Sequence, residues 1–176
     1  MTLAERCARI EFLLLDVDGV LTDGGIIYDD DGRELKQFHV RDGSALKYWQ
    51  LAGKRAGILT GRTSKVVEVR AKELGIAPVI QGGTHKLTAY RDVIASLGVQ
   101  VQQVAFVGDD LPDIPVLRHC GLAIAVADAC PEVIAEAHFV TRAPGGRGAV
   151  REAIEFILRS QGQWANIVER YRNEQL

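Results

Sequence analysis

Short apolar segments alternate with amphipathic segments along most of this chain, and no other feature restricts its fold as strongly. After a first apolar run at 12–16, the runs that predict strands lie at 55–59, 78–80, 104–107, 122–126 and 138–140. The segments between them predict helices, at 64–74, 85–97, 114–119 and 131–137. Repeated strand–helix units with apolar strands form a parallel sheet that helices cover on both faces. We therefore expect an α/β fold with a three-layer, doubly wound parallel sheet.

The segments outside this alternation predict smaller elements. Thr2 and Glu5 have capping-box spacing, which predicts a short helix before the first strand. Two alternating runs around Asp29-Asp30-Asp31-Gly32 predict a β-hairpin flap over about 25–40. Asp42 is a candidate N-cap for a helix that runs to about residue 52. From about residue 143 to 176 we expect a Gly-rich tail, with a flexible link at 144–148 and an amphipathic helix at 149–159.

The amino-acid composition limits the classes of protein to which this chain can belong. The 176 residues, with 47% hydrophobic and 25% charged side chains, predict one soluble domain over 1–176. A net charge of −2 provides no field that would attract nucleic acid or an anionic membrane. No apolar run has the length of a membrane span, and the first residues lack a signal-peptide core. Three cysteines without a CxxC pair are typical of reduced thiols, so we expect a cytoplasmic protein.

Residues that bear reactive groups follow several of the predicted strands. Asp16 and Asp18 leave the first strand on the same side, because strand side chains alternate with a period of two. Thr60 and Asp109 follow two later strands, and Lys86 lies near the start of a helix. Open α/β sheets place their sites at the carboxyl ends of strands. Paired carboxylates there need a compensating cation, which indicates a divalent metal and phosphate chemistry.

In this ordered set of motifs, the chain resembles the haloacid dehalogenase superfamily, whose fold is Rossmann-like. The resemblance implies that Asp16 attacks phosphorus and forms an aspartyl-phosphate, while Asp18 acts as general acid and then general base. It implies that Mg²⁺ is held by Asp16, Asp109 and the main-chain carbonyl of Asp18. Thr60 would hydrogen-bond the phosphoryl oxygens, and Lys86 would supply fixed positive charge. Dehalogenases lack an acid where Asp18 stands, so Asp18 favours a phosphomonoesterase or a phosphomutase.

The spacing of the motifs leaves no room for a cap domain. The interval between Asp18 and Thr60 holds a hairpin and one helix, and that between Thr60 and Lys86 holds one helix and one strand. We therefore expect a site that is open in the single chain, and the resemblance to capless members of the superfamily implies that a neighbouring chain covers it. Asp110 and Asp113 fit either a carboxylate beside the metal or a structural cap.

Within the capless members, the chain is similar to the 3-deoxy-D-manno-octulosonate 8-phosphate phosphatases, a family of lipopolysaccharide sugar synthesis. The similarity lies in 16–24, 38–43, Thr60-Gly61-Arg62 with Arg70, and 144–152. It implies a sugar-acid phosphate as substrate and a homotetramer in which hairpins associate and the Gly-rich tail can close over a neighbouring site. The substrate contacts that it implies are Asp18, His39, Val40, Arg41, Asp42, Gly43, Lys47, Arg62, Arg70 and Lys86. His39 stands where the family usually has Asn, and Lys47 and Arg70 by themselves also fit surface ion pairs.

Two other functions stay open at this point. A phosphatase for a nine-carbon, sialic-acid-type 9-phosphate shares the capless fold and most motifs. A non-catalytic oligomerisation module is the alternative from a different class. The complete set of Asp16, Asp18, Thr60, Lys86 and Asp109 argues against a module without activity.

Overall fold

A six-stranded parallel sheet forms the centre of the fold, with β1 (Phe12–Leu15) in its middle. The structure, a computed structural model, describes residues 1–83 and 85–173. The other strands of the sheet are β4 (Arg55–Leu59), β5 (Val79–Ile80), β6 (Val104–Gly108), β7 (Leu122–Ala125) and β8 (Phe139–Val140). Their order is β5-β4-β1-β6-β7-β8, so the chain winds outward from β1 in both directions. The predicted doubly wound α/β fold is confirmed.

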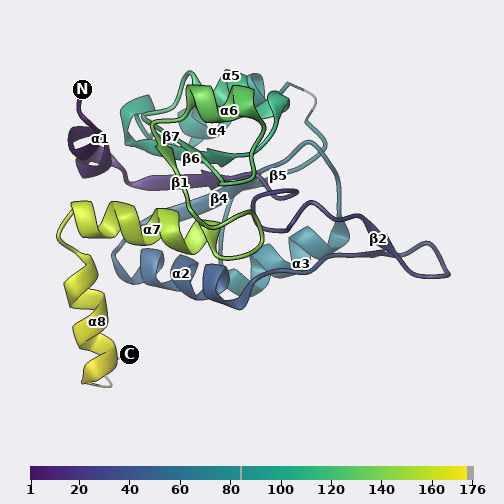
Figure 1. Ribbon diagram of the computed structural model, residues 1–176, viewed down its shortest axis with the longest axis horizontal. Helices are drawn as coiled ribbons and strands as arrows, with labels where there is room; N and C mark the ends of the chain where they lie inside the picture. The colour runs from purple at the N-terminus through teal and green to yellow at the C-terminus, as the bar shows by residue number, and fades with distance from the viewer. Residues whose placement is uncertain (84, 174–176) are drawn as a thin grey trace.

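Helices cover both faces of this sheet (Figure 1). On one face lie α2 (Val40–Leu51), α3 (Lys65–Leu74) and α7 (Ala149–Ser160). On the other lie α4 (Lys86–Leu97), α5 (Ile114–Leu117) and α6 (Pro131–Glu136). Short helices α1 (Leu3–Arg9), η1 (Val101–Gln103) and η2 (Leu111–Asp113) and the final helix α8 (Trp164–Arg172) complete the described chain. None of the helices in the described chain combines the length and the apolar character that crossing a bilayer requires.

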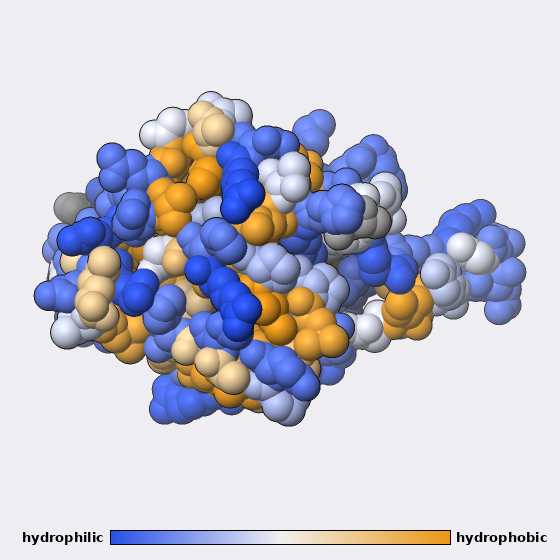
Figure 2. All heavy atoms as spheres, turned by 90° about the horizontal axis from the view of Figure 1, so that it is seen from above, coloured by the Kyte–Doolittle hydropathy of each residue, from blue (hydrophilic) through white to orange (hydrophobic). Residues whose placement is uncertain are grey.

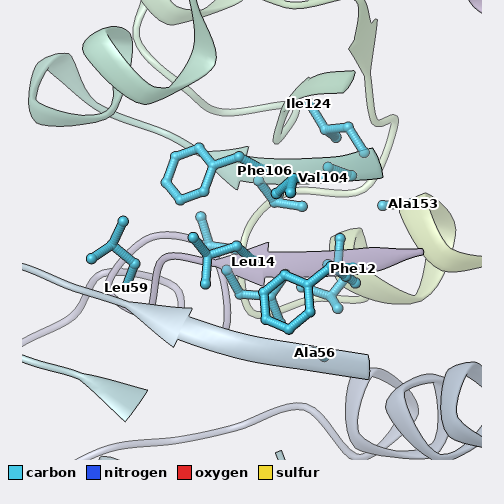
Figure 3. Close-up of a cluster of buried hydrophobic side chains, with 14 of the residues drawn as sticks. Phe12, Leu14, Ala56, Leu59, Val104, Phe106, Ile124 and Ala153 are labelled. Atoms are coloured by element: carbon cyan, nitrogen blue, oxygen red, sulfur yellow. The ribbon is translucent and has the colours of Figure 1, made fainter. Parts of the chain in front are cut away.

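The core lies on both sides of β1, which explains why its sequence is apolar without alternation. All four residues of β1 are buried. Figure 3 shows Phe12 and Leu14 of β1 packed among side chains of the neighbouring strands, including Phe106 and Leu59. Burying one such side chain contributes about 1.5–3 kcal/mol. This packing holds β1, β4 and β6 in register, so their carboxyl ends are fixed relative to one another.

The predicted β-hairpin is present and has short strands. Strands β2 (Ile27–Tyr28) and β3 (Glu34–Leu35) pair antiparallel around a turn in which Gly32 has a φ of +76°. Figure 2 shows the hairpin standing away from the body of the molecule. Several large apolar side chains of the hairpin are exposed: Ile26, Ile27, Tyr28 and Leu35.

The predicted capping role of Asp42 is wrong. Helix α2 begins at Val40, so Asp42 lies inside its first turn. The buried Asp42 carboxylate instead accepts a hydrogen bond of 2.7 Å from the main-chain N–H of Arg151 in α7. Asp42 therefore ties α2 to the start of α7, a contact between segments far apart in sequence.

The prediction of a flexible link at 144–148 is also wrong, because this segment packs tightly against the loop that follows β1. The N–H of Gly146 donates to the Val20 carbonyl at 2.9 Å. The N–H of Gly145 donates to the Asp128 carboxylate at 2.8 Å, and Arg147 forms an ion pair of 3.2 Å with Asp23. The glycines are needed here for close contact between two backbones.

Candidate active site

The carboxyl ends of β1, β4 and β6 meet at one edge of the sheet. Leu15 of β1 pairs with Ile58 of β4 and with Val107 of β6, so the residues that follow these strands emerge side by side. They border a cavity of about 210 Å³. Its lining residues are Asp16, Asp18, Thr60, Gly61, Arg62, Lys86, Asp109, Asp110 and Pro112. The fold thus brings together the residues for which the sequence predicted catalytic roles.

Lys86 joins two carboxylates at the back of this cavity. Its ammonium nitrogen donates to Asp16 Oδ2 at 2.7 Å and to Asp113 Oδ1 at 2.6 Å. Burial alone would lower the pKa of Lys86, but the attraction of Asp16 and Asp113 outweighs it and raises the pKa above its ordinary value. The other oxygen of Asp16 accepts the N–H of Val17 at 2.7 Å. Lys86 therefore stays charged and holds the Asp16 carboxylate in one orientation.

Asp109 is the least compensated of the acidic groups. Among the described residues, its buried Oδ1 has no hydrogen-bond partner. Burial, with Asp16 and Asp113 nearby, raises the pKa of Asp109 to about 8, and burial with the charge of Asp113 raises that of Asp16 to about 6. Gly19, with a φ of +87°, lies so close that a Cβ there would be 2.0 Å from Asp109 Oδ2. The backbone thus encloses an acid of which one oxygen has no partner in the part of the chain that the structure describes.

The three carboxylates have the arrangement of a hard-cation site. Oxygens of Asp16, Asp109 and Asp113 all lie within 4.8 Å of one another. One ammonium group, that of Lys86, faces these three acids, so two negative charges are left when all are ionised. Magnesium prefers carboxylate oxygens and would neutralise this excess. The donor set and the unpartnered oxygen of Asp109 therefore fit Mg²⁺.

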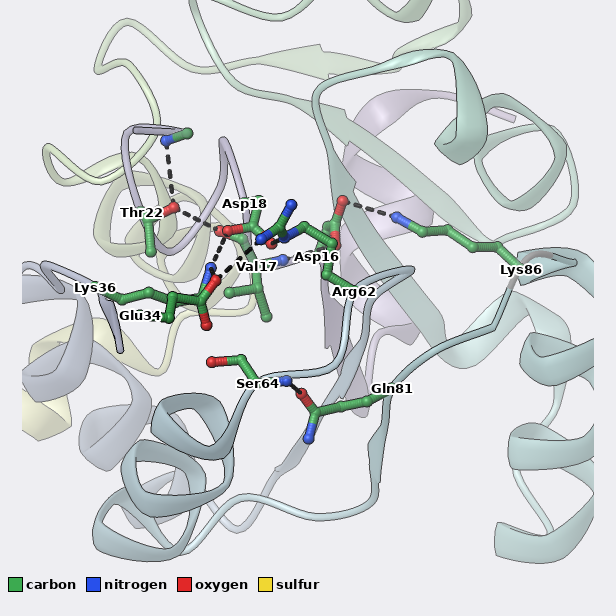
Figure 4. A network of polar contacts seen from close by, with 11 residues as sticks. Asp16, Val17, Asp18, Thr22, Glu34, Lys36, Arg62, Ser64, Gln81 and Lys86 are labelled. Carbon is green, nitrogen blue, oxygen red and sulfur yellow. Dashed lines mark hydrogen bonds and ion pairs between the residues drawn. The ribbon is translucent and has the colours of Figure 1, made fainter. Parts of the chain in front are cut away.

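Asp18 belongs to a second network, at the mouth of the cavity (Figure 4). Lys36, from the hairpin, donates to Asp18 Oδ1 and lies 3.3 Å from Glu34 Oε1. Arg62 reaches Glu34 at 3.1 Å and lies 3.7 Å from Asp18 Oδ2. Two acids and two cations thus alternate around a closed ring.

The other residues predicted to contact substrate lie elsewhere. His39 precedes α2, and Val40, Arg41, Asp42, Gly43 and Lys47 lie on it. Arg70 on α3 has its guanidinium 5.7 Å from the ring centre of Phe38, and Lys47 donates to the Leu74 carbonyl at 2.7 Å. Within the described chain, none of these residues lines the cavity around Asp16. Their predicted role in substrate binding thus stays a prediction for which the single chain provides no contact.

Two further residues belong to the site: Asp113, whose role the sequence left open between two alternatives, and Lys36, which the sequence did not single out. Asp113 is fully buried, binds Lys86, and accepts the N–H of Asp109 at 2.9 Å, so it serves both as a cap and as a member of the acidic cluster. The sequence had given these two roles as alternatives for Asp113. No sequence signal pointed to Lys36, because only the folded hairpin carries it to Asp18.

Two larger hollows, of about 430 and 450 Å³, lie along α7 and α8. Their charged side chains include arginine–glutamate ion pairs such as Arg142 with Glu152 and Arg172 with Glu169. Such exposed ion pairs contribute little energy, and the acidic cluster of Asp16, Asp109 and Asp113 lies outside both hollows. The smaller cavity at the sheet edge is therefore the candidate active site.

The raised pKa values predict how metal-free stability depends on pH. Asp16 and Asp109 bind protons more tightly when folded, at about 6 and about 8, than at their ordinary value of 3.8. The native state then holds more protons than the unfolded state between these values, so unfolding becomes easier as pH rises from about 4 to about 8. Without Mg²⁺, the melting temperature should fall across this range.

Scanning calorimetry at a series of pH values, with EDTA or with saturating Mg²⁺, measures this effect. Mg²⁺ favours the ionised carboxylates, so its stabilisation should increase with pH. Asp109→Asn should flatten the metal-free slope, because it removes the group with the largest shift. A metal-free melting temperature that rises from pH 5 to pH 8 would contradict the electrostatics of this cluster.

Known proteins are similar to this chain in sequence and in fold. The sequence profile of the haloacid dehalogenase-like hydrolases matches residues 63–154. The 3-deoxy-D-manno-octulosonate 8-phosphate phosphatase of Yersinia pestis is 48% identical over 157 residues, which are 89% of this chain and 84% of that protein. Its counterpart in Escherichia coli K12 is 46% identical over 158 residues, or 90% of this chain and 84% of that protein.

A solved structure agrees over nearly the whole chain. The crystal structure of the phosphatase of the same name from Moraxella catarrhalis, in complex with a magnesium ion, a phosphate ion and a KDO molecule, matches with a TM-score of 0.93 at 40% identity. The match covers 96% of this chain and 97% of that chain. The resemblance that the motifs indicate is thus confirmed. The chain belongs to the haloacid dehalogenase-like hydrolases and, among them, to the family of the 3-deoxy-D-manno-octulosonate 8-phosphate phosphatases.

Proposed function

We propose that this protein is a Mg²⁺-dependent phosphatase that hydrolyses 3-deoxy-D-manno-octulosonate 8-phosphate to the free sugar acid and phosphate, in lipopolysaccharide sugar synthesis. The observation that carries the proposal is the acidic cluster of Asp16, Asp109 and Asp113 around Lys86, at one edge of the sheet. Phosphatases with this name are 46–48% identical over most of the chain.

In the first half of the reaction, an oxygen of Asp16 attacks the phosphorus of the ester. A bond from Asp16 to phosphorus forms as the bond to the sugar oxygen breaks, and Asp18 gives its proton to that departing oxygen. Lys86 holds Asp16 at 2.7 Å and offsets the negative charge that gathers near it. The fully enclosed Thr60 lines the same cavity and offers its hydroxyl to a phosphoryl oxygen.

In the second half, water attacks the phosphorus of the aspartyl-phosphate. Asp18, now ionised, takes the proton of this water, the bond from Asp16 to phosphorus breaks, and inorganic phosphate leaves. Asp16 and Asp109, with the main-chain carbonyl of Asp18, would hold Mg²⁺, which supplies neutralisation of the phosphoryl oxygens when bound. Asp113 keeps its place beside Lys86 and the N–H of Asp109 throughout.

The substrate is tested by turnover of two esters side by side. We expect hydrolysis of the eight-carbon 8-phosphate to be at least about tenfold more efficient than that of a nine-carbon, sialic-acid-type 9-phosphate, a difference of about 1.4 kcal/mol in transition-state binding. EDTA should abolish both activities and added Mg²⁺ should restore them. Preference for the nine-carbon ester would contradict the assigned substrate, and no metal-dependent phosphatase activity on any ester would favour a non-catalytic module.

We further propose that four chains assemble and complete one another's sites. A cavity of about 210 Å³ holds a phosphate group but is smaller than the 300–1,000 Å³ typical of sites that enclose a whole ligand. Four apolar side chains of the hairpin are 46–58% exposed: Ile26, Ile27, Tyr28 and Leu35. Their burial between chains would bring cationic residues such as Arg70 and Lys47 of one chain toward the substrate bound by another.

Light scattering after size exclusion should give a mass of about four chains. Tyr28→Asp should shift the protein toward smaller species and reduce turnover, because a charge is costly in an apolar interface. Asp30→Asn, at the exposed tip of the same hairpin, serves as the control and should leave the mass unchanged. A monomeric protein with full activity would contradict completion of the site by a neighbour.

We also propose that the protein works in the cytoplasm. Cys7, Cys120 and Cys130 are all free thiols, as is usual in a reducing compartment. Fractionation of cells that produce the protein, followed by immunodetection, tests this location.

A further inference from the structure

The hairpin places one lysine in contact with the carboxylate that the proposed mechanism uses twice. The side chain of Lys36 is 2% exposed, although the surrounding hairpin stands out from the body. Its ammonium group contacts Asp18 Oδ1 and lies 3.3 Å from Glu34 Oε1 (Figure 4). A charged group hidden from water is costly unless it is paired, so the buried ammonium of Lys36 depends on its contacts with Asp18 and Glu34.

Arg62 closes the ring on the side opposite Lys36. It lies 3.1 Å from Glu34 Oε1 and 3.7 Å from Asp18 Oδ2. The two contacts with Asp18 differ, because the one from Lys36 is a hydrogen bond and the one from Arg62 is a longer ion pair. Within the described part of the chain, the carboxylate of Asp18 is thus oriented chiefly by Lys36.

Orientation matters here because Asp18 must reach two different atoms in one catalytic cycle. It protonates the departing sugar oxygen and then accepts a proton from the attacking water. Lys86 and the N–H of Val17 hold Asp16 from both sides, whereas Asp18 lies two residues further from β1 and its side chain is partly exposed. A carboxylate misplaced by about 1 Å can lose about a hundredfold in rate.

We propose that Lys36 is the positioning residue of Asp18, so that the β-hairpin contributes to proton transfer. The proposal rests on the proposed function, because it presumes that Asp18 is the acid and base. Glu34 acts one step further away, by holding Lys36, and Arg62 is left free to exchange Glu34 for an anionic group of the substrate.

The test compares Lys36→Met with Arg33→Met. Both remove one positive charge from the same hairpin, but the Arg33 side chain is 74% exposed and pairs with Asp31 at the hairpin turn. Each variant is assayed with the sugar-acid phosphate, whose alkoxide must be protonated to leave, and with p-nitrophenyl phosphate, whose phenolate leaves without a proton. Rapid-quench measurements follow the first turnover and the steady state separately.

With Lys36→Met and the sugar-acid ester, we expect kcat to fall about ten- to a hundredfold while KM changes less than about threefold. With p-nitrophenyl phosphate, the first turnover should stay within about threefold of wild type and release one nitrophenolate per site. The steady state should then be slow, because breakdown of the aspartyl-phosphate still needs the base. Glu34→Gln should give the same pattern with smaller changes in rate, and Arg33→Met should match wild type.

Other outcomes overturn the proposal. A higher KM with unchanged kcat would make Lys36 a substrate ligand, and equal loss in both phases with both esters would make it a general support of the fold. If Lys36→Met does not fold by circular dichroism, Glu34→Gln decides alone, and wild-type behaviour of that variant overturns the proposal. If wild type cleaves p-nitrophenyl phosphate but not the sugar-acid phosphate, the proposed substrate fails, and the comparison is completed with another alkyl phosphate that wild type does hydrolyse.

Discussion

Asp16→Asn is expected to lose at least about a thousandfold in turnover of the sugar-acid phosphate, because an amide oxygen cannot replace the attacking carboxylate. The substitution keeps the shape of the side chain and leaves an oxygen that can accept the hydrogen bond from Lys86. Loss of activity would therefore report on the nucleophile rather than on packing. Acid-quenched wild-type enzyme should carry phosphate on the peptide that contains Asp16, and the variant should carry none.

The same substitution should raise the metal-free melting temperature by a few degrees at pH 8. Burial and the charge of Asp113 raise the pKa of Asp16 to about 6, so its ionised form costs stability above that pH, and a neutral amide removes the cost. Asp30→Asn, in the exposed turn of the hairpin, is the matched control and should change neither activity nor melting temperature. Comparable activity of Asp16→Asn and wild type would assign the nucleophile to another residue.

Higher stability together with lost activity is the pattern of a site built at the expense of stability. Burial disfavours the charged forms of the acids that make the cluster reactive, and a buried oxygen of Asp109 has no partner within residues 1–83 and 85–173. The fold tolerates them because β1, β4 and β6 are held by the apolar core beneath (Figure 3). Activity therefore depends on the acids at the sheet edge, whereas stability depends on the apolar core beneath them.

The sequence was sufficient for features that depend on neighbouring residues. The strand–helix alternation predicted the parallel sheet, and Gly75 and Gly98 end α3 and α4 in the left-handed conformation. The carboxyl-end rule for open sheets brought Asp16 and Asp109 to one place, as the parallel register requires. These expectations hold because each needs only local periodicity and a general rule of topology.

Features that depend on distant segments could not be predicted in this way. Asp42 has the sequence context of a cap, yet its partner is the N–H of Arg151, more than a hundred residues later. Lys36 reaches Asp18 only after the hairpin folds back over the end of β1. Arg70 and Lys47 were expected to contact the substrate, which stays a prediction; in the described chain the Arg70 guanidinium lies over the Phe38 ring and Lys47 donates to the Leu74 carbonyl. In each case the decisive contact lies outside the window in which sequence patterns carry information.

The packed segment 144–148 leads to the second large effect. In Gly145→Ala the new Cβ would lie 1.7 Å from the main-chain oxygen of Gly19, far inside contact distance. Neither backbone has room to move. The N–H of Gly146 donates a hydrogen bond to the Val20 carbonyl, and Gly19 lies so close to Asp109 that a Cβ there would be 2.0 Å from Asp109 Oδ2. We expect a loss of about 1–3 kcal/mol in the free energy of unfolding, measured by urea denaturation.

The turnover of Gly145→Ala should also fall, by about a hundredfold at a temperature at which the variant is still folded. Gly19 follows Asp18 in the chain, so a shift of Gly19 displaces the Asp18 carboxylate and the edge of the metal site. Gly83→Ala is the matched control: it adds the same methyl group where no atom lies within 4 Å. Its stability should stay within about 0.5 kcal/mol of wild type. If Gly145→Ala kept both its stability and its turnover, segment 144–148 would have to move aside freely. The close packing of this segment against the loop after β1 would then not be the cause of the alignment between that loop and the acids of the cluster.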